Sequence, residues 1–240
     1  MGIAFQAMTR PLCIRTRNLK LDTEQLLSYC AETKDRFMSP RLIKLGLFEG
    51  KATPNPKITD SRILDRQHGH PLVAPLVRGI NESIASFTNE LGMKTFQPIG
   101  QNARILHYGD GVFFKPHSDN YAKSTMHRVL TCLYYFHREP KRFTGGELVL
   151  YGGSGRVETI EPENGLLVVF DSSMAHEVKP VVCSSNEFLD GRFCITVWIH
   201  RYQSKLSRIR RDARMISRKF GFDLSKLGVK VRPYIPFLFK

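Results

Sequence analysis

A run of short strand-like segments between residues 103 and 200 constrains the fold more than any other feature of the sequence. Apolar and β-branched residues alternate in these segments, and glycine, proline, asparagine and aspartate separate them. The predicted strands are Ala103–Tyr108, Arg128–His137, Glu147–Tyr151, Gly155–Ile160, Leu166–Asp171, Glu177–Val182 and Arg192–His200. Because no helix interrupts them, a parallel doubly wound sheet is excluded, and a sandwich or jelly roll is favoured.

Helical patterns precede this region. Asp22 and Gln25 have the spacing of a capping box, and apolar residues follow at helical intervals as far as Phe37. The segment from Gly50 to Pro71 is rich in turn residues and is predicted to be a loop. A second helix is predicted from Val73 to Leu91, ended by Gly92. We therefore expect three regions, which are a helical flank packing on the barrel (1–98), the β core (99–202) and a basic helix with a tail (203–240).

The positive charge is concentrated near the C-terminus. Residues 201–240 contribute +10 of the net charge of +14, and an apolar stripe from Leu206 to Phe220 predicts a basic amphipathic helix there. Such a helix packs on the core with a solvated charged face, or it binds an acidic partner such as nucleic acid, an anionic membrane or an acidic protein. The apolar segment Arg232–Phe239 is predicted to dock on the core or to mediate self-association.

The cysteines and the hydropathy indicate a reducing compartment. Five cysteines lack any C-x-x-C spacing, which favours free thiols. No apolar run approaches the roughly 20 residues of a membrane span, and the N-terminus lacks the features of a secretory signal. A cytoplasmic location without a transmembrane segment is the expectation.

One short pattern predicts a metal site. His117 and Asp119 lie two residues apart, so an extended chain directs both side chains to the same face. With the remote His176 they supply two imidazoles and one carboxylate, the facial triad that leaves three positions open on a non-haem ferrous ion. A jelly roll would bring His176 from a facing strand across the cavity. A His-x-Asp pair alone is common by chance, so the context decides.

Other histidines have weaker patterns. The pair His68 and His70 lies in a polar loop without a further ligand at a suitable spacing, which argues against a second metal site. Four more histidines lie in or beside predicted strands and are interpreted as structural, namely His107, His127, His137 and His200.

Several ordered motifs support the triad. They are Arg128–Phe136, Thr144–Leu148, Gly165–Phe170, His176–Pro180 and Arg192–Trp198. In this order they resemble the prolyl 4-hydroxylase type of Fe(II)/2-oxoglutarate dioxygenase over roughly residues 100–202. The resemblance implies a mainly β fold with flanking helices, a double-stranded β-helix (a cupin-like jelly roll), and Fe(II) ligands at His117, Asp119 and His176.

The resemblance also implies a cosubstrate site. Arg192 matches the residue that binds the distal carboxylate of 2-oxoglutarate, which a planar guanidinium can hold bidentately. Tyr135 matches a tyrosine that donates to the same carboxylate, and Thr196 shares the face of Arg192 by the strand period. Tyr108 resembles a tyrosine near the other end of the cosubstrate. The sixteen-residue gap between His176 and Arg192 is longer than usual, and Ser184–Phe188 has the composition of an inserted loop.

The predicted function is hydroxylation of an sp³ carbon, with a prolyl residue of a peptide or protein as the first candidate. Oxygen and 2-oxoglutarate would be consumed, succinate and CO₂ released, with ascorbate as an optional further cofactor. The carboxylate of Asp119 argues against halogenation, because related halogenases replace it with a small residue. Two alternatives remain open, namely a hydroxylase of a free amino acid or small natural product, and a non-catalytic jelly-roll module that binds an acidic partner.

Overall fold

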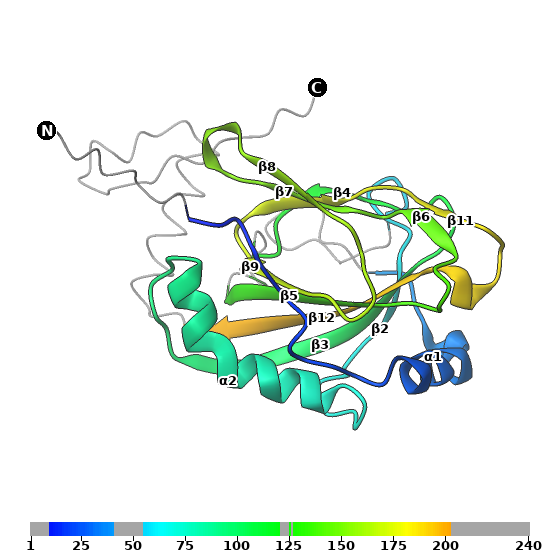
Figure 1. The fold of residues 1–240 in the computed structure, drawn as a ribbon, viewed down its shortest axis with the longest axis horizontal. Helices are drawn as coiled ribbons and strands as arrows, with labels where there is room; N and C mark the ends of the chain where they lie inside the picture. Colours follow the sequence, from blue (N-terminus) through cyan, green and yellow to red (C-terminus); the bar gives the residue numbers. More distant parts are fainter. Residues whose placement is uncertain (1–9, 41–54, 121–124, 126, 203–240) are drawn as a thin grey trace, which may run out of the picture. The chain divides into compact units, whose positions relative to one another are not determined.

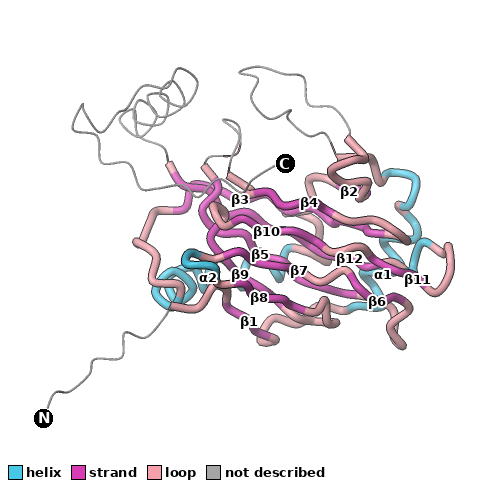
Figure 2. The backbone as a smooth tube through the Cα atoms, turned by 90° about the horizontal axis from the view of Figure 1, so that it is seen from above, coloured by secondary structure: helices cyan, strands magenta, loops and turns pink. Residues whose placement is uncertain are grey.

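Two antiparallel β-sheets face each other, and two helices cover the outer side of the larger sheet (Figure 1). This computed structural model describes residues 10–40, 55–120, 125 and 127–202. Viewed from above, the smaller sheet lies over the larger one (Figure 2). The arrangement confirms the predicted jelly roll.

Six strands form the larger sheet, and all its pairings are antiparallel. Their order is β1 (Ile14–Thr16), β9 (Leu167–Asp171), β5 (Arg128–Phe136), β12 (Arg192–Arg201), β3 (Pro98–Tyr108) and β2 (Arg62–Leu64). The smaller sheet contains β4 (Phe114–His117), β10 (Ala175–Val178), β7 (Leu148–Tyr151) and β8 (Val157–Ile160). A two-stranded sheet pairs β11 (Val181–Cys183) with β6 (Phe143–Gly145).

Strand β12 lies in the middle of the larger sheet and separates two environments. Every second side chain points towards the helices and is fully buried in the main core, namely Phe193, Ile195, Val197 and Ile199. The intervening side chains line a cavity between the sheets, namely Arg192, Cys194, Thr196 and Trp198. This alternation follows from the period of two in an extended chain.

The helices bury the apolar faces that the sequence predicts. Helix α2 (Ala74–Glu90) buries the residues of its stripe from Leu76 to Phe87 against the larger sheet, and Gly92 has the positive φ of 58° expected at a helix end. Helix α1 (Thr23–Glu32) is capped at its N-terminus by Asp22, whose carboxylate accepts hydrogen bonds from the backbone N and the side-chain Nε2 of Gln25. Both predicted helices are confirmed.

Some boundaries differ from the sequence prediction. Helix α1 ends at Glu32, and Phe37 is buried from an extended segment instead of from the helix. The predicted strand Glu177–Val182 is divided into β10 and β11 around Pro180, which lacks the backbone N–H that a continuous strand requires. Four strands of three or four residues were not predicted, because such lengths hold too few alternations to reveal a period. They are β1, β2, β4 and β6.

The three-region division remains a prediction. Residues 1–98 contribute β1 and β2 to the larger sheet as well as both helices, and β2 lies inside the segment predicted to be a loop. The predicted C-terminal helix and the segment Arg232–Phe239 lie outside the described residues.

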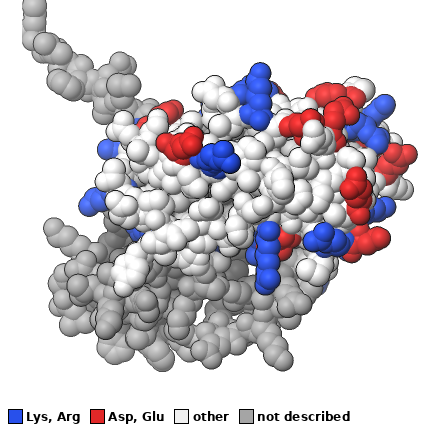
Figure 3. Space-filling model, turned by 90° about the horizontal axis from the view of Figure 1, so that it is seen from below, with Lys and Arg blue, Asp and Glu red and all other residues white. Residues whose placement is uncertain are grey.

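Charges of both signs are mixed on the face shown in Figure 3, where no patch of one sign dominates the described surface. Oppositely charged side chains also pair directly, as in Arg15–Glu158 and Arg138–Asp190. All five cysteines are free. Neither α-helix in the described ranges is long and apolar enough to cross a membrane.

His107 on β3 is a structural histidine, as the sequence predicts. Its ring packs among Phe37, Phe188 and Phe193, and its Nε2 lies 2.9 Å from the carbonyl oxygen of Phe188. Burial, with a smaller effect of nearby cations, lowers the pKa of His107 to about 4. The ring is therefore neutral in the folded protein at pH values where an unfolded histidine would be charged.

We predict that His107 contributes to acid destabilisation. An unfolded histidine takes up a proton below about pH 6.5, whereas folded His107 does so only near pH 4. The free energy of unfolding should therefore fall as the pH drops through this window, by about 3 kcal/mol in total for this residue. Urea denaturation at several pH values should show a shallower fall for His107→Gln than for the wild type. His68→Gln, at an exposed position, should leave the slope unchanged, and equal slopes for all three proteins would contradict the assignment.

Candidate metal centre

The pairing of β4 with β10 brings two imidazoles together. His117 ends β4, and His176 lies directly opposite it on β10, as its Cα partner in the antiparallel ladder. Residues opposite each other in such a ladder have Cβ atoms roughly 5 Å apart on the same face. His176 therefore comes from a neighbouring strand of the same sheet, and the prediction of a facing strand was wrong.

Asp119 completes the group just beyond the end of β4. Its carboxylate oxygens lie 3.9 Å from Nε2 of His117 and 3.8 Å from Nε2 of His176. The three potential ligand atoms lie within 4.8 Å of one another, the one such group of three His, Cys, Asp or Glu side chains in the described part of the chain. Ligand atoms about 2.1 Å from one metal ion lie roughly 3 to 4 Å apart, so a divalent ion fits the group.

Backbone carbonyls orient both imidazoles. Nδ1 of His117 lies 2.9 Å from the oxygen of Lys115, and Nδ1 of His176 lies 3.0 Å from the oxygen of Met174. A carbonyl oxygen can only accept, so in the neutral form of each ring Nδ1 carries the proton and Nε2 keeps its lone pair. The two Nε2 atoms that face Asp119 are therefore the ones able to bind a metal.

The electrostatic environment favours the protonation states that bind a metal. Burial, followed by the neighbouring His176, lowers the pKa of His117 to about 3, so the ring is neutral at physiological pH. Burial alone would raise the pKa of the Asp119 carboxyl, but His176, His117, Arg128 and the hydrogen bond from Thr131 together hold that pKa below its usual value. A neutral imidazole beside an ionised carboxylate needs no proton release before it binds a metal.

The cavity of about 50 Å³ next to this group extends along the inner face of β12. At its inner end Arg192 is 1% exposed, and its guanidinium lies 4.8 Å from the ring centres of both Tyr108 and Tyr135. Nε of Arg192 and the hydroxyl of Tyr135 are buried, and neither atom has a hydrogen-bond partner among the described residues. A buried cation without a partner is costly, so these two donors together indicate a site for a carboxylate ligand.

The remaining predicted cosubstrate residues also lie here. Thr196 is 3% exposed and lines the cavity, with the sulfur of Cys194 3.9 Å from its hydroxyl. Burial raises the pKa of Tyr135, so its hydroxyl stays protonated and can donate. The ring contact places Tyr108 beside Arg192, whereas the sequence analysis expected it near the other end of the cosubstrate.

A second group of buried polar atoms lies further along the same strands, and we call it the outer rim. Each member has one polar side-chain atom that is buried without a partner, and they are Asn102, Arg128, Trp198 and His200. The guanidinium of Arg128 lies 3.8 Å from the centre of the Trp198 ring and donates to the backbone oxygen of Asp119. From the sequence, His200 was interpreted as structural and the other three had no assigned role, although the strand period places Trp198 on the cavity face.

Two hydroxyl residues were also missed. Thr131 on β5 donates to the carboxylate of Asp119 at 2.7 Å, and Ser172 lies 2.9 Å from the Thr131 hydroxyl. The period along β5 from Tyr135 could have placed Thr131 on the cavity face. Ser172 had no sequence signal, because its position depends on the turn after β9.

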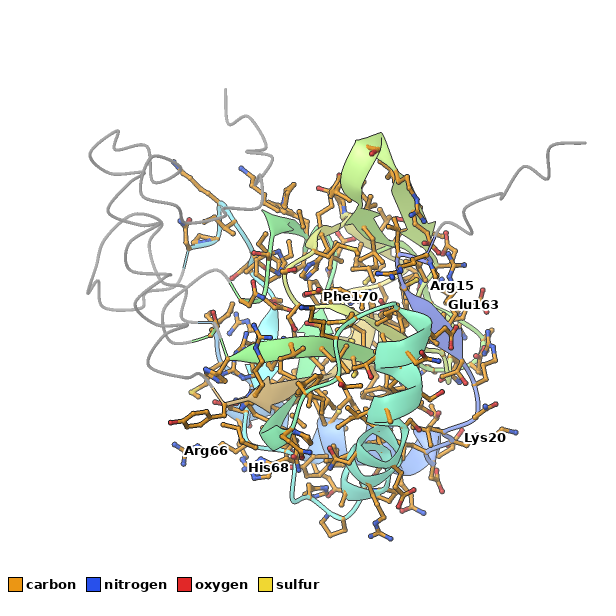
Figure 4. The ribbon with its side chains drawn as sticks, turned by 90° about the vertical axis from the view of Figure 1, so that its left-hand side faces the viewer. Arg15, Lys20, Arg66, His68, Glu163 and Phe170 are labelled. Atoms are coloured by element: carbon orange, nitrogen blue, oxygen red, sulfur yellow. The ribbon has the colours of Figure 1, made fainter. Side chains whose placement is uncertain are left out.

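A larger cavity of about 330 Å³ lies away from this group, lined by residues such as Arg17, Tyr134 and Asn164. No histidine, cysteine, aspartate or glutamate lines it, so the smaller cavity is the better candidate for catalysis. Phe170 packs edge-on against His176, with ring centres 4.9 Å apart, and lies in the interior in Figure 4, whereas His68 lies on the outside. The exposed His68 is not part of the metal group.

Residues 103–200 match the family model of the 2OG-Fe(II) oxygenase superfamily. An uncharacterized PKHD-type hydroxylase from Synechocystis is 32% identical over 141 residues, which cover 55% of this chain and 46% of that protein. The chain thus spans about half the length of this relative.

Solved structures share the fold. A prolyl-4-hydroxylase from Pseudomonas putida has a TM-score of 0.57 at 18% identity, covering 80% of this chain and 94% of that one. A prolyl hydroxylase from Trichoplax adhaerens, solved with a peptide fragment of hypoxia inducible factor, has a TM-score of 0.58 at 18% identity, covering 79% and 84%. The triad and the buried arginine behind it lie within residues 103–200, the part of the chain that matches the model of the 2OG-Fe(II) oxygenase superfamily.

Proposed function

We propose that this protein is an Fe(II)- and 2-oxoglutarate-dependent dioxygenase that hydroxylates an sp³ carbon, with a prolyl residue of a peptide or protein as the first candidate substrate. The observation that carries this proposal is the combination of two sites in one cavity. A His-Asp-His group fits a divalent metal, and a buried guanidinium whose Nε has no hydrogen-bond partner among the described residues lines the same cavity.

His117, Asp119 and His176 would hold the ferrous ion through two neutral imidazoles and one carboxylate, which leaves three positions open. Bound iron and 2-oxoglutarate would supply oxygen activation, with release of succinate and CO₂ and insertion of one oxygen atom into a C–H bond. Asp119 occupies the position that a halogenase would leave free for chloride, which supports hydroxylation.

Arg192 would bind the distal carboxylate of 2-oxoglutarate. Its unpaired Nε and the hydroxyl of Tyr135 are two donors that this carboxylate would satisfy, and the pairing would remove the cost of a buried isolated cation. The Thr196 hydroxyl would be a further contact. Leu133, Leu148 and other apolar side chains line the cavity, so they would exclude water from the cosubstrate.

The outer rim is our candidate for substrate contact. Nε of Arg128 and Nε1 of Trp198 are donors, whereas Oδ1 of Asn102 is an acceptor. A polypeptide backbone offers both donors and acceptors, so it could pair with the mixed donors and acceptor of the outer rim. The prolyl hydroxylase names of the structural neighbours also support a peptidyl substrate, one of them having been solved with a peptide.

A free amino acid or a small natural product is the second candidate. Arg128 is an additional cation next to the metal group, beyond the one needed for 2-oxoglutarate, and a substrate carboxylate would pair with it. Burial lowers the pKa of Arg128 to about 10, so it remains charged at neutral pH.

Further expectations rest on the sequence alone. These are a cytoplasmic location, ascorbate as a further cofactor, and an acidic partner for residues 203–240. A non-catalytic module that binds such a partner is the third candidate, and it would retain salt-dependent binding without any turnover.

Removal of one imidazole should abolish the metal complex. Anaerobic addition of ferrous iron and 2-oxoglutarate to the wild type should give the visible charge-transfer band of the chelated cosubstrate, and His176→Ala should not. His68→Ala is the matched control and should keep the band, because His68 is exposed and remote from the group. A band that persists in His176→Ala would refute the ligand assignment, and no band in the wild type would refute the proposed function.

Succinate release should identify the substrate class. We expect prolyl-containing peptides to stimulate succinate formation by the ferrous enzyme above its rate without substrate, and mass spectrometry should find a peptide product heavier by one oxygen atom. Stimulation by free proline or other amino acids, but not by peptides, would favour the second candidate. If oxygen and 2-oxoglutarate give no succinate under any of these conditions, the protein is not a dioxygenase.

A further inference from the structure

Two buried hydroxyl groups lie behind the carboxylate of Asp119. Thr131 and Ser172 are both 0% exposed. The Thr131 hydroxyl lies 2.7 Å from Oδ2 of Asp119, and the Ser172 hydroxyl lies 2.9 Å from that of Thr131. The three side chains form a continuous hydrogen-bonded chain that ends on a candidate metal ligand.

The direction of these hydrogen bonds follows from the number of protons that each group carries. An ionised carboxylate can only accept, and each hydroxyl has a single proton. Thr131 must therefore donate to Asp119, which leaves its oxygen to accept the proton of Ser172. Each donation polarises the next, so the bond that reaches Oδ2 is stronger than one from an isolated threonine.

The main chain fixes the same three residues. The backbone oxygen of Ser172 accepts from the N–H groups of Asp119 and Asn120 at 3.0 and 3.2 Å, and the Ser172 N–H donates to Val129. Thr131 lies on β5 between its ladder partners Phe170 on β9 and Trp198 on β12. The Thr131 hydroxyl therefore approaches Oδ2 from a strand held on both sides.

We propose that Thr131, supported by Ser172, is a positioning residue that keeps Asp119 as a ligand through one oxygen atom. The hydrogen bond takes up one lone pair of Oδ2, which lies 3.8 Å from Nε2 of His176, and so favours Oδ1, 3.9 Å from Nε2 of His117, as the oxygen that binds the metal. A carboxylate that bound through both oxygens would take one of the three open positions. The inference rests on the proposed function, because it assigns a role towards the ion of that site.

Isosteric variants test this role. Thr131→Val removes the hydroxyl at nearly constant volume, and Thr131→Ser restores it. Thr88→Val is the matched control, because Thr88 is 1% exposed in α2 and its hydroxyl donates to the carbonyl of Ile84, away from the metal group. Anaerobic titration with Mn²⁺, followed by electron paramagnetic resonance, would measure the affinity. Spin-echo modulation in D₂O would count the water molecules on the bound ion.

We expect Thr131→Val to weaken Mn²⁺ binding by about 10- to 100-fold, the usual effect of losing a hydrogen bond to a metal ligand. The Mn²⁺ ion bound to Thr131→Val should also carry one water molecule fewer than the ion bound to the wild type, since Asp119 would bind through both oxygens. Thr131→Ser and Thr88→Val should resemble the wild type, and Ser172→Ala should weaken binding less than Thr131→Val.

Other outcomes distinguish a failure of this inference from a failure of the proposed function. Wild-type affinity and water count in Thr131→Val would overturn the inference and leave the metal site intact. If the wild type itself binds no Mn²⁺ or Fe²⁺, the proposed function fails instead. If Thr131→Val does not fold, Ser172→Ala decides, and unchanged affinity and water count in that variant would overturn the inference.

Discussion

The alternation of side chains along β12 is the constraint on which the rest of the structure depends. This strand pairs with β3 on one side and β5 on the other, so it cannot slip by one residue without exchanging its two faces. One face is fully buried under the helices, and the other carries Arg192, Thr196 and Trp198 into the cavity. Core packing thus fixes the register, and the register fixes the polar groups of the candidate site.

The buried polar atoms without partners follow the same geometry. All six that occur in the described residues belong to β3, β5 or β12. Two lie at Arg192 and Tyr135, and the other four form the outer rim. Buried polar groups normally find partners within the protein, so exceptions grouped on three neighbouring strands, two of them at the cavity residues Arg192 and Trp198, suggest ligands at both ends of these strands. The metal group lies beside the outer rim, where Arg128 donates to Asp119. A cosubstrate bound at Arg192 and Tyr135 and a substrate bound at the outer rim would account for both sets of unpaired atoms.

Much of this arrangement could be predicted from the sequence, and the failures have physical causes. Period two placed Arg192, Thr196 and Trp198 on one face, and helical periods located α1 and α2. The position of His176 opposite His117 could not be derived, because the partner of a short edge strand depends on sheet order instead of local pattern. The hydrogen bonds from Thr131 and Ser172 join residues far apart in the chain, so no spacing reveals them. Residues 203–240, which carry most of the net positive charge, lie outside the described residues.

The most direct test of this account is the affinity for 2-oxoglutarate, measured by anaerobic calorimetry with Mn²⁺ bound, for the wild type and for Arg192→Met. Methionine keeps an unbranched apolar side chain but leaves no cation to pair with the distal carboxylate. We predict that the wild type binds one 2-oxoglutarate and that Arg192→Met binds it roughly 100- to 1,000-fold more weakly, with Mn²⁺ affinity unchanged. Equal affinity for 2-oxoglutarate in the two proteins would contradict the assignment of the cavity.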